Sequence, residues 1–284
     1  MNADKLGRFK ADIYLMSPPC QPYTRTGHQN QAADPRSKSF LAFLEALPIL
    51  DANNKAPKYL FIENVLGFEN SNTRDLLVQT AHVAHYRFQE FLINPMHLGI
   101  PNSRTRYYFM AKHVSLGPFK DQKLDGQLLR SDVAEDACWK NFCSTNLHLN
   151  FQATPTLSDF FGLPMHNLES YRIPKKIFDK HAMVYDIVHP GANHTCCFTK
   201  GYGTYAQATG SILNFGSEPN GMKWEDHRYF TEYEIAQLMG FPISDSNHHF
   251  LSFPDSTSLR QRYKLLGNSL NVMVVSKLLA YLLS

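Results

Sequence analysis

Residues 11–22 read Ala-Asp-Ile-Tyr-Leu-Met-Ser-Pro-Pro-Cys-Gln-Pro, and this stretch decides how the chain is interpreted. The apolar run from Ile13 to Met16 is typical of a β-strand, and the two prolines stop it because proline lacks the backbone N–H that a central strand needs. Cys20 follows directly, between prolines that restrict the backbone on each side. We therefore expect a strand that runs into a rigid loop presenting a thiol.

Helices and strands alternate after this loop. Apolar residues at helical spacing predict a helix over 37–50, and similar patterns predict further elements: strands at 59–62, 87–93 and 106–112, and a helix at 72–83. This alternation favours an α/β fold with a mainly parallel sheet. In such sheets ligands bind beyond the carboxyl ends of the strands, where Cys20 and Glu63 both lie.

The pattern loses its regularity in the middle of the chain. We predict a smaller target-recognition domain at 113–227, inserted between two parts of a catalytic domain, 1–112 and 228–284. Order returns at Thr231-Glu-Tyr-Glu234, a capping box that opens a helix, and Gly240 marks the end of this helix.

The apolar run at the C-terminus, residues 270–283, is shorter than the roughly 20 residues of a membrane span. We interpret it as a packed helix and expect no membrane partner. The net charge of +3 is compatible with a polyanionic partner but does not select one.

Cysteine usage indicates a reducing compartment, cytoplasmic or nuclear. The five cysteines are an odd number without regular spacing: Cys20, Cys138, Cys143, Cys196 and Cys197. A zinc site built from the last four with His194 is a weaker hypothesis, because structural zinc uses tighter paired spacings. We therefore expect no metal.

Four ordered motifs resemble those of the cytosine-5 methyltransferases: Ser17-Pro-Pro-Cys-Gln-Pro22, Glu63-Asn-Val65, the triplet Arg104-Thr-Arg106, and Gly267-Asn-Ser-Leu-Asn271. A fifth stretch, Cys197-Phe-Thr199 followed by Lys-Gly-Tyr, resembles the branch that methylates tRNA-aspartate. The resemblance covers roughly residues 11–112 and 190–283. It implies a Rossmann-like methyltransferase sheet and S-adenosylmethionine as methyl donor. It also implies tRNA-Asp as partner, methylated at cytosine 38 of the anticodon loop.

The resemblance also implies roles for four residues. Carbon 5 of cytosine becomes nucleophilic when a thiolate adds to carbon 6, and Cys20 would be that nucleophile. Glu63 would hydrogen-bond ring nitrogen 3 and the exocyclic amine. Because a free thiol has a pKa of about 8.5, Arg104 or Arg106 would help as a nearby positive charge. Phosphate contacts, or an exposed basic turn, remain open for these arginines.

Further residues are carried over by the same resemblance. The methyl donor would be contacted by Ser17, Asn268, Ser269 and Asn271. The target nucleotide would be recognised by Gln21, Asn64, Cys197, Phe198 and Thr199. An unpaired RNA loop suits such a site, because flipping a base out costs least where it is already unpaired.

The family's glycine-rich donor loop and the acidic residue that binds the ribose are not found. Ten residues precede Ala11, whereas two strand-helix units need roughly 60. We expect an N-terminally truncated chain with uncertain activity, in which the strand at 13–16 lies at a sheet edge. The alternatives are a DNA cytosine-5 methyltransferase, a non-catalytic nucleic-acid-binding remnant and a cysteine hydrolase.

Overall fold

The computed structural model describes residues 3–19, 38–131, 137–147, 155–161, 168–243 and 251–284. Contacts divide the chain into two compact units. Unit 1 comprises residues 1–94, 105–148 and 278–284, and unit 2 comprises 95–104 and 149–277. The three domain segments predicted from the sequence have boundaries that differ from those of these units, and the predicted domains stay a prediction.

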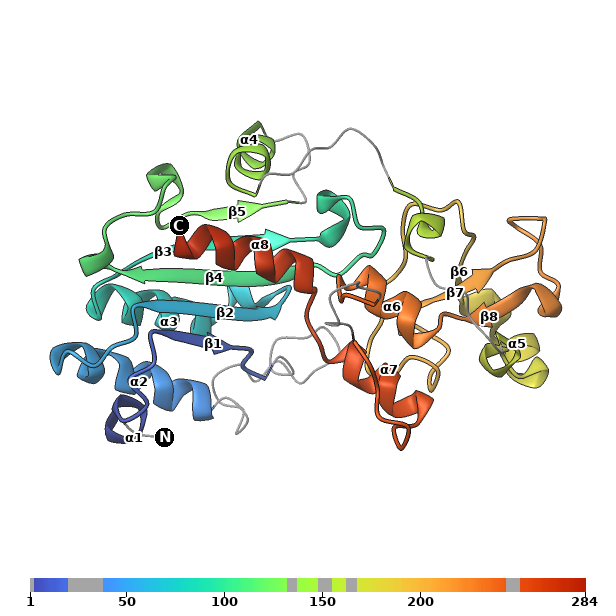
Figure 1. The fold of residues 1–284 in the computed structure, drawn as a ribbon, viewed down its shortest axis with the longest axis horizontal. Helices are drawn as coiled ribbons and strands as arrows, with labels where there is room; N and C mark the ends of the chain where they lie inside the picture. Colours follow the sequence, from blue (N-terminus) through green and yellow to red (C-terminus); the bar gives the residue numbers. More distant parts are fainter. Residues whose placement is uncertain (1–2, 20–37, 132–136, 148–154, 162–167, 244–250) are drawn as a thin grey trace. The chain divides into compact units, whose positions relative to one another are not determined.

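Unit 1 is built on a five-stranded sheet with the strand order β1-β2-β4-β3-β5 (Figure 1). Its elements are α1 (Ala3–Gly7), β1 (Ile13–Met16), α2 (Lys38–Ala52), β2 (Tyr59–Val65), α3 (Asn72–Val83), β3 (Tyr86–Ile93), β4 (Arg106–His113), β5 (Leu128–Arg130) and α4 (Ala137–Asn146). The helices and strands predicted between residues 37 and 112 are therefore confirmed, with small shifts at their ends.

Four of the five strands of this sheet run in the same direction, and one is reversed. β1 pairs with β2, and β3 with β5, in parallel, but β4 lies between β2 and β3 and is antiparallel to both. Helices α2 and α3 lie in the connections from β1 to β2 and from β2 to β3, whereas β4 follows β3 without an intervening α-helix and returns antiparallel beside it. The α/β class and the mainly parallel sheet are both confirmed, with β4 as the one reversed strand of the five in this sheet.

Both faces of this sheet are covered. On one face, α2 and α3 bury Phe43, Leu47 and Leu77 against alternate residues of the strands. On the other face, Phe91 of β3 packs on Phe142 of α4, and Phe142 packs edge-to-face on Tyr281. This two-sided packing holds the ends of β2 and β4 in fixed positions.

Strand β1 lies at one end of the sheet order. Among the described residues it pairs only with β2, in the register Ile13↔Tyr59 to Met16↔Ile62. The side chain of Leu15 is 59% exposed. The expected edge position of this strand is therefore observed in the part of the chain that the structure describes.

Unit 2 contains a three-stranded sheet with the order β6-β7-β8. Its helices and strands are α5 (Lys175–His181), β6 (Asp186–Val188), β7 (Ser211–Asn214), β8 (His227–Tyr229), α6 (Glu232–Leu238) and α7 (Leu259–Gly267). An aromatic core joins the sheet to α6 and α7, with Tyr202 packed edge-on against Tyr263 and Phe198 against Phe230.

The predicted capping box at the start of α6 is confirmed. The Thr231 hydroxyl accepts from the backbone N–H of Glu234, and the Glu234 carboxylate accepts from the N–H of Thr231, at 3.1 and 2.8 Å. After the helix, Gly240 has a φ of +76°, and an added Cβ would lie 2.8 Å from the nitrogen of Met273. Glycine is therefore required for this turn.

The stretch Leu259–Leu283 is long and apolar enough to cross a membrane by length and composition alone. It is formed by two helices, α7 and α8 (Val272–Leu283), separated by residues 268–271. Leu278 and Leu282 are fully buried, and the Tyr281 hydroxyl donates to Gln89 at 2.9 Å. The C-terminal helix is packed, as predicted.

Candidate active site

The end of β2 carries a carboxylate whose two oxygens are both engaged. Ser17, in the loop after β1, donates from its hydroxyl to Glu63 Oε2 at 2.7 Å. Arg106, at the start of β4, places its Nε 3.2 Å from Glu63 Oε1. Both side chains of this ion pair are less than one-fifth exposed. Because partial burial weakens solvent screening, the pair holds the carboxylate in one orientation.

Asn64 fixes the backbone of the same loop. Its amide nitrogen donates to the carbonyl of Pro18 at 3.3 Å, and its side-chain oxygen accepts from the N–H of Val65 at 2.9 Å. The residue is 1% exposed. The loop that follows β1 is therefore tied to β2 at two consecutive residues, Ser17 and Pro18. The predicted nucleophile Cys20, and its neighbour Gln21, lie outside the described residues.

The sequence motifs predicted that Ser17 contacts the methyl donor and that Asn64 contacts the target base. The structure shows what each does within the chain: Ser17 orients Glu63, and Asn64 anchors Pro18. No local pattern reveals these contacts, because β1 and β2 are adjacent only after the sheet has formed. Their predicted ligand contacts stay predictions.

Arg104 has different surroundings from Arg106. It belongs to unit 2, is 4% exposed, and donates to the backbone carbonyls of Phe198, at 3.1 Å, and Gly267, at 3.2 Å. It also donates to the carbonyl of Ser269. A buried guanidinium that satisfies several carbonyls ties distant segments together. Arg104 therefore clamps two of the predicted motifs to each other.

The Cys197-Phe-Thr199 segment is one side of this clamp. The Cys197 sulfur lies 3.4 Å from Arg104 Nη1, and the Phe198 side chain is buried in the core of unit 2. The hydroxyl of Thr199 accepts from the N–H of Gly201 at 3.3 Å. An added Cβ on Gly267 would overlap the backbone of Thr199 and Lys200. Glycine is therefore needed where α7 meets this turn.

The predicted donor contacts at the C-terminus fall into two groups. Asn268 and Ser269 follow α7 directly, and Asn268 is exposed. Asn271 is 1% exposed, and both ends of its amide are used within unit 2. Its nitrogen donates to the Leu238 carbonyl at 3.2 Å, and its oxygen accepts from the N–H of Val274 at 3.1 Å. Asn271 thus joins α6 to the first turn of α8.

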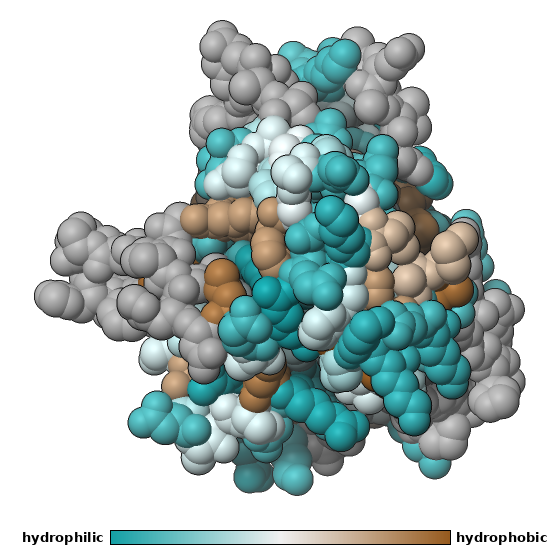
Figure 2. Space-filling model, turned by 90° about the vertical axis from the view of Figure 1, so that its right-hand side faces the viewer, coloured by the Kyte–Doolittle hydropathy of each residue, from teal (hydrophilic) through white to brown (hydrophobic). Residues whose placement is uncertain are grey.

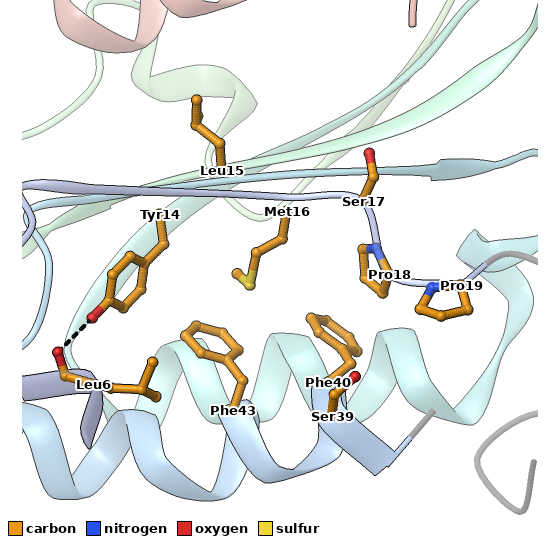
Figure 3. A pocket seen from close by; sticks show the side chains of 10 residues that line it. All are labelled: Leu6, Tyr14, Leu15, Met16, Ser17, Pro18, Pro19, Ser39, Phe40 and Phe43. Carbon is orange, nitrogen blue, oxygen red and sulfur yellow. Dashed lines mark hydrogen bonds between the residues drawn. The ribbon is translucent and has the colours of Figure 1, made fainter. Parts of the chain in front are cut away.

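A groove of about 350 Å³ lies between β1 and α2 in unit 1. Figure 3 shows Tyr14 and Met16 pointing from the strand towards Phe40 and Phe43 of the helix, with Ser17, Pro18, Pro19 and Ser39 at one end. The lining is mostly apolar and aromatic. The helical spacing of the two phenylalanines predicted the helix, but no pattern in the sequence predicted the groove beside it.

Among the side chains that the structure describes, no three histidine, cysteine or acidic residues are placed to hold a metal ion. Cys143 and Cys196 of the weaker zinc hypothesis belong to different units. Burial raises the pKa of the Cys143 thiol to about 12. Burial, together with the neighbouring Asp186, raises that of Cys196 to about 11. Neither thiol is primed for ionisation at neutral pH.

These features define an α/β protein in which a carboxylate, its arginine and a proline-rich loop converge at the ends of strands. The model of the C-5 cytosine-specific DNA methylase family matches residues 1–284. The chain therefore belongs to the cytosine-5 methyltransferase family.

Similar proteins support this membership. The chain is 35% identical to the human protein named tRNA (cytosine(38)-C(5))-methyltransferase, over 98% of this chain and 84% of the human one. Its structure is similar to that of the Dnmt2 methyltransferase of S. pombe, with a TM-score of 0.78 and 30% identity. The match covers all of this chain and 80% of that one. The methyltransferase EhMeth of Entamoeba histolytica gives the same TM-score, with 32% identity, covering 99% of this chain and 80% of its own. The predicted methyltransferase fold is confirmed.

Proposed function

We propose that this chain transfers a methyl group to carbon 5 of a cytosine in tRNA, specifically cytosine 38 in the anticodon loop of tRNA-Asp. The observation that carries the proposal is the orientation of Glu63 by Ser17 and Arg106. Similar proteins suggest the substrate: the human and mouse proteins, 35% and 36% identical to this chain, are named tRNA (cytosine(38)-C(5))-methyltransferase.

The proposed chemistry begins with Cys20. Its thiolate adds to carbon 6 of the flipped cytosine, which makes carbon 5 nucleophilic. Glu63 accepts a hydrogen bond from the amine of the base and delivers a proton to N3, and so neutralises the negative charge that the addition pushes into the ring. Arg106 keeps the Glu63 carboxylate in place. After carbon 5 takes up the methyl group and loses its proton, the thiolate leaves and the aromatic ring is restored.

The methyl donor in this proposal is S-adenosylmethionine, which supplies an electrophilic methyl group on sulfur. The groove beside Ser17 suits part of it, because the faces of Phe40, Pro18 and Pro19 favour a flat heteroaromatic ring. No carboxylate for the ribose hydroxyls lines the groove in the described part of the chain. Ser17, Asn268 and Ser269 remain the proposed polar contacts, whereas Asn271 is used as a helix cap.

A basic surface in unit 2 supports RNA as the substrate. Helix α7 has no acidic residue and exposes Arg260 and Lys264 one turn apart. The turn that packs against it at Gly267 exposes Lys200, and Tyr205 in the same loop is 69% exposed. Cations beside an exposed aromatic ring suit phosphates and an unstacked base.

DNA is the second candidate substrate, because a Dictyostelium discoideum relative with 33% identity is named DNA (cytosine-5)-methyltransferase. A cytoplasmic or nuclear location also belongs to the proposal. It is supported by the three cysteines whose side chains are described, Cys143, Cys196 and Cys197, which are all free thiols.

The test is transfer of a labelled methyl group from S-adenosylmethionine to a tRNA-Asp transcript, to the same transcript with uridine at position 38, and to duplex DNA. We expect incorporation only into the first, and none with Cys20→Ala. Incorporation into DNA alone would replace tRNA with the second candidate. If the chain binds tRNA but neither methylates it nor forms a covalent adduct with 5-azacytosine RNA, the proposal is overturned. The chain would then be a nucleic-acid-binding protein without catalytic activity.

A further inference from the structure

One helical face of unit 2 combines exposed aliphatic side chains with unmatched positive charge. Helix α5 is followed directly by the 3-10 turn Ala182–Val184; the junction residue His181 leaves helical angles, with φ −123° and ψ 2°, and Ala182 returns to them. Phe178 on the inner side is buried in a small core with Ile173 and Ile212, and Ala182 packs against it. The outer side carries Lys176, Ile177, Lys180, Met183 and Val184, which we call the α5 stripe.

The exposure of the α5 stripe is unusual for apolar residues. Met183 is 92% exposed, Val184 46% and Ile177 39%. Figure 2 looks onto the end of unit 2 that carries α5 and β8, and brown apolar groups lie there among hydrophilic ones. Apolar groups gathered on one face mark an interaction surface more often than single exposed residues do. Methionine is also enriched in protein interfaces.

The charges of the stripe have one sign. Lys176 and Lys180 are exposed, and no ion pair is found for either among the described residues. The neighbouring Lys175 is paired with Asp179 at 2.9 Å, so it lies beside the stripe with its charge already matched. Because α5 presents aliphatic groups one turn from lysines, a complementary surface must offer apolar side chains flanked by carboxylates.

We infer that the α5 stripe docks an acidic amphipathic helix of another protein. A second copy of this chain fits poorly, because a two-fold interface would bring the same lysines face to face. A nucleic acid fits poorly as well, since the stripe offers no aromatic ring to stack on a base. An anionic membrane would gain only about 1 kcal/mol from each of two lysines, which is weak anchoring.

The test uses a fluorescein-labelled synthetic peptide of about 20 residues, with leucine on one helical face and glutamate on the other. A peptide of the same composition in scrambled order is the control. We expect fluorescence anisotropy to show binding of the amphipathic peptide with a Kd of about 10–100 μM, typical of a weak interface, and no binding of the scrambled one.

Matched variants locate the site. The paired substitutions Met183→Ser with Val184→Ser, and Lys176→Glu with Lys180→Glu, should each weaken binding about tenfold or more. Lys175→Ala, next to the stripe, should leave binding unchanged. The melting temperatures of all three proteins should match that of the unaltered chain, because every substituted side chain is exposed.

Three results would overturn the inference: no binding of the amphipathic peptide, equal binding of the scrambled peptide, or binding that survives both paired substitutions. It would also be overturned if the stripe substitutions instead abolished binding to phosphatidylserine vesicles or tRNA. The same holds if they abolished self-association in sedimentation. None of these readouts depends on methyl transfer, so failure here leaves the proposed function intact.

Discussion

Arg104 and Arg106 stand two residues apart in one motif, yet they belong to different units and do different work. Arg106 is in unit 1, at the start of β4, and contacts the carboxylate of Glu63. Arg104 is in unit 2, and the partners described above are mainly backbone carbonyls. One residue of a motif can therefore orient a reacting group while its neighbour holds loops together.

Glu63→Gln should produce the largest effect. The amide keeps the size of the side chain but cannot deliver a proton to N3, where negative charge develops, so methyl transfer to tRNA should fall about 10²- to 10⁴-fold. The melting temperature should barely change. Glu45→Gln, an exposed carboxylate on α2, is the control. Transfer within threefold of the unaltered chain would show that Glu63 does not act on the base.

Arg104→Met should destabilise the protein most. Removing the guanidinium leaves one buried and two partly buried carbonyls without this donor, at a cost of about 3 kcal/mol in the free energy of unfolding. Urea unfolding of Arg104→Met beside Arg106→Met measures this difference directly. If both variants lose less than about 1 kcal/mol, the clamp in unit 2 is not a stabilising feature and the contrast between the arginines disappears.

Gly267→Ala tests the same clamp from the other side. The new methyl group would overlap the backbone of Thr199 and Lys200, so α7 or the turn must shift, at a cost of about 2 kcal/mol. Asn268→Ala, the exposed neighbour, should change the free energy of unfolding by less than about 0.5 kcal/mol. Equal stability of the two variants would mean that the contact relaxes freely.

Arg106→Lys tests whether Arg106 acts by orienting the Glu63 carboxylate. Lysine keeps the charge but not the planar donor geometry, so the Glu63 carboxylate should be held less firmly. We expect kcat to fall about fivefold, equivalent to about 1 kcal/mol, with the KM for tRNA unchanged. A rise in KM alone would assign Arg106 to phosphate binding, which is the alternative left open by the sequence.

Lys264→Ala should have the smallest effect. It tests the proposed RNA-binding surface of unit 2 without disturbing the contacts of Arg104. One lost phosphate contact should lower the slope of log K against log salt concentration by about 0.7–0.9. Filter binding to tRNA at several salt concentrations measures it. Lys175→Ala, in an ion pair with Asp179, is the control. An unchanged slope in Lys264→Ala would remove this helix from the RNA surface.

Local signals in the sequence predicted local structure well. The capping box at Thr231 and the glycine at 240 are each recognised within a few residues, and both are confirmed. The strand that ends in Glu63-Asn64 is likewise marked by its own apolar run. Such features depend on neighbours in the chain, so a single sequence contains what is needed to find them.

Contacts between distant segments could not be predicted in the same way. The insertion of β4 between β2 and β3 depends on pairing across the sheet, and the bond from Ser17 to Glu63 joins residues 46 positions apart. The separation of Arg104 from Arg106 follows from a unit boundary that falls between them, which no motif marks. The motifs in the sequence were enough to predict the type of reaction, but the contacts that each side chain makes could be found only from the three-dimensional structure.

The most direct test of the central claim is formation of a covalent adduct on tRNA-Asp carrying 5-azacytosine at position 38. This reaction reports the addition to carbon 6 and does not require methyl transfer. We predict an adduct stable in denaturing gels for the unaltered chain and for Glu45→Gln, a much slower one for Glu63→Gln, and none for Cys20→Ala. An adduct that forms equally fast without the Glu63 carboxylate, or that persists without Cys20, would contradict the account.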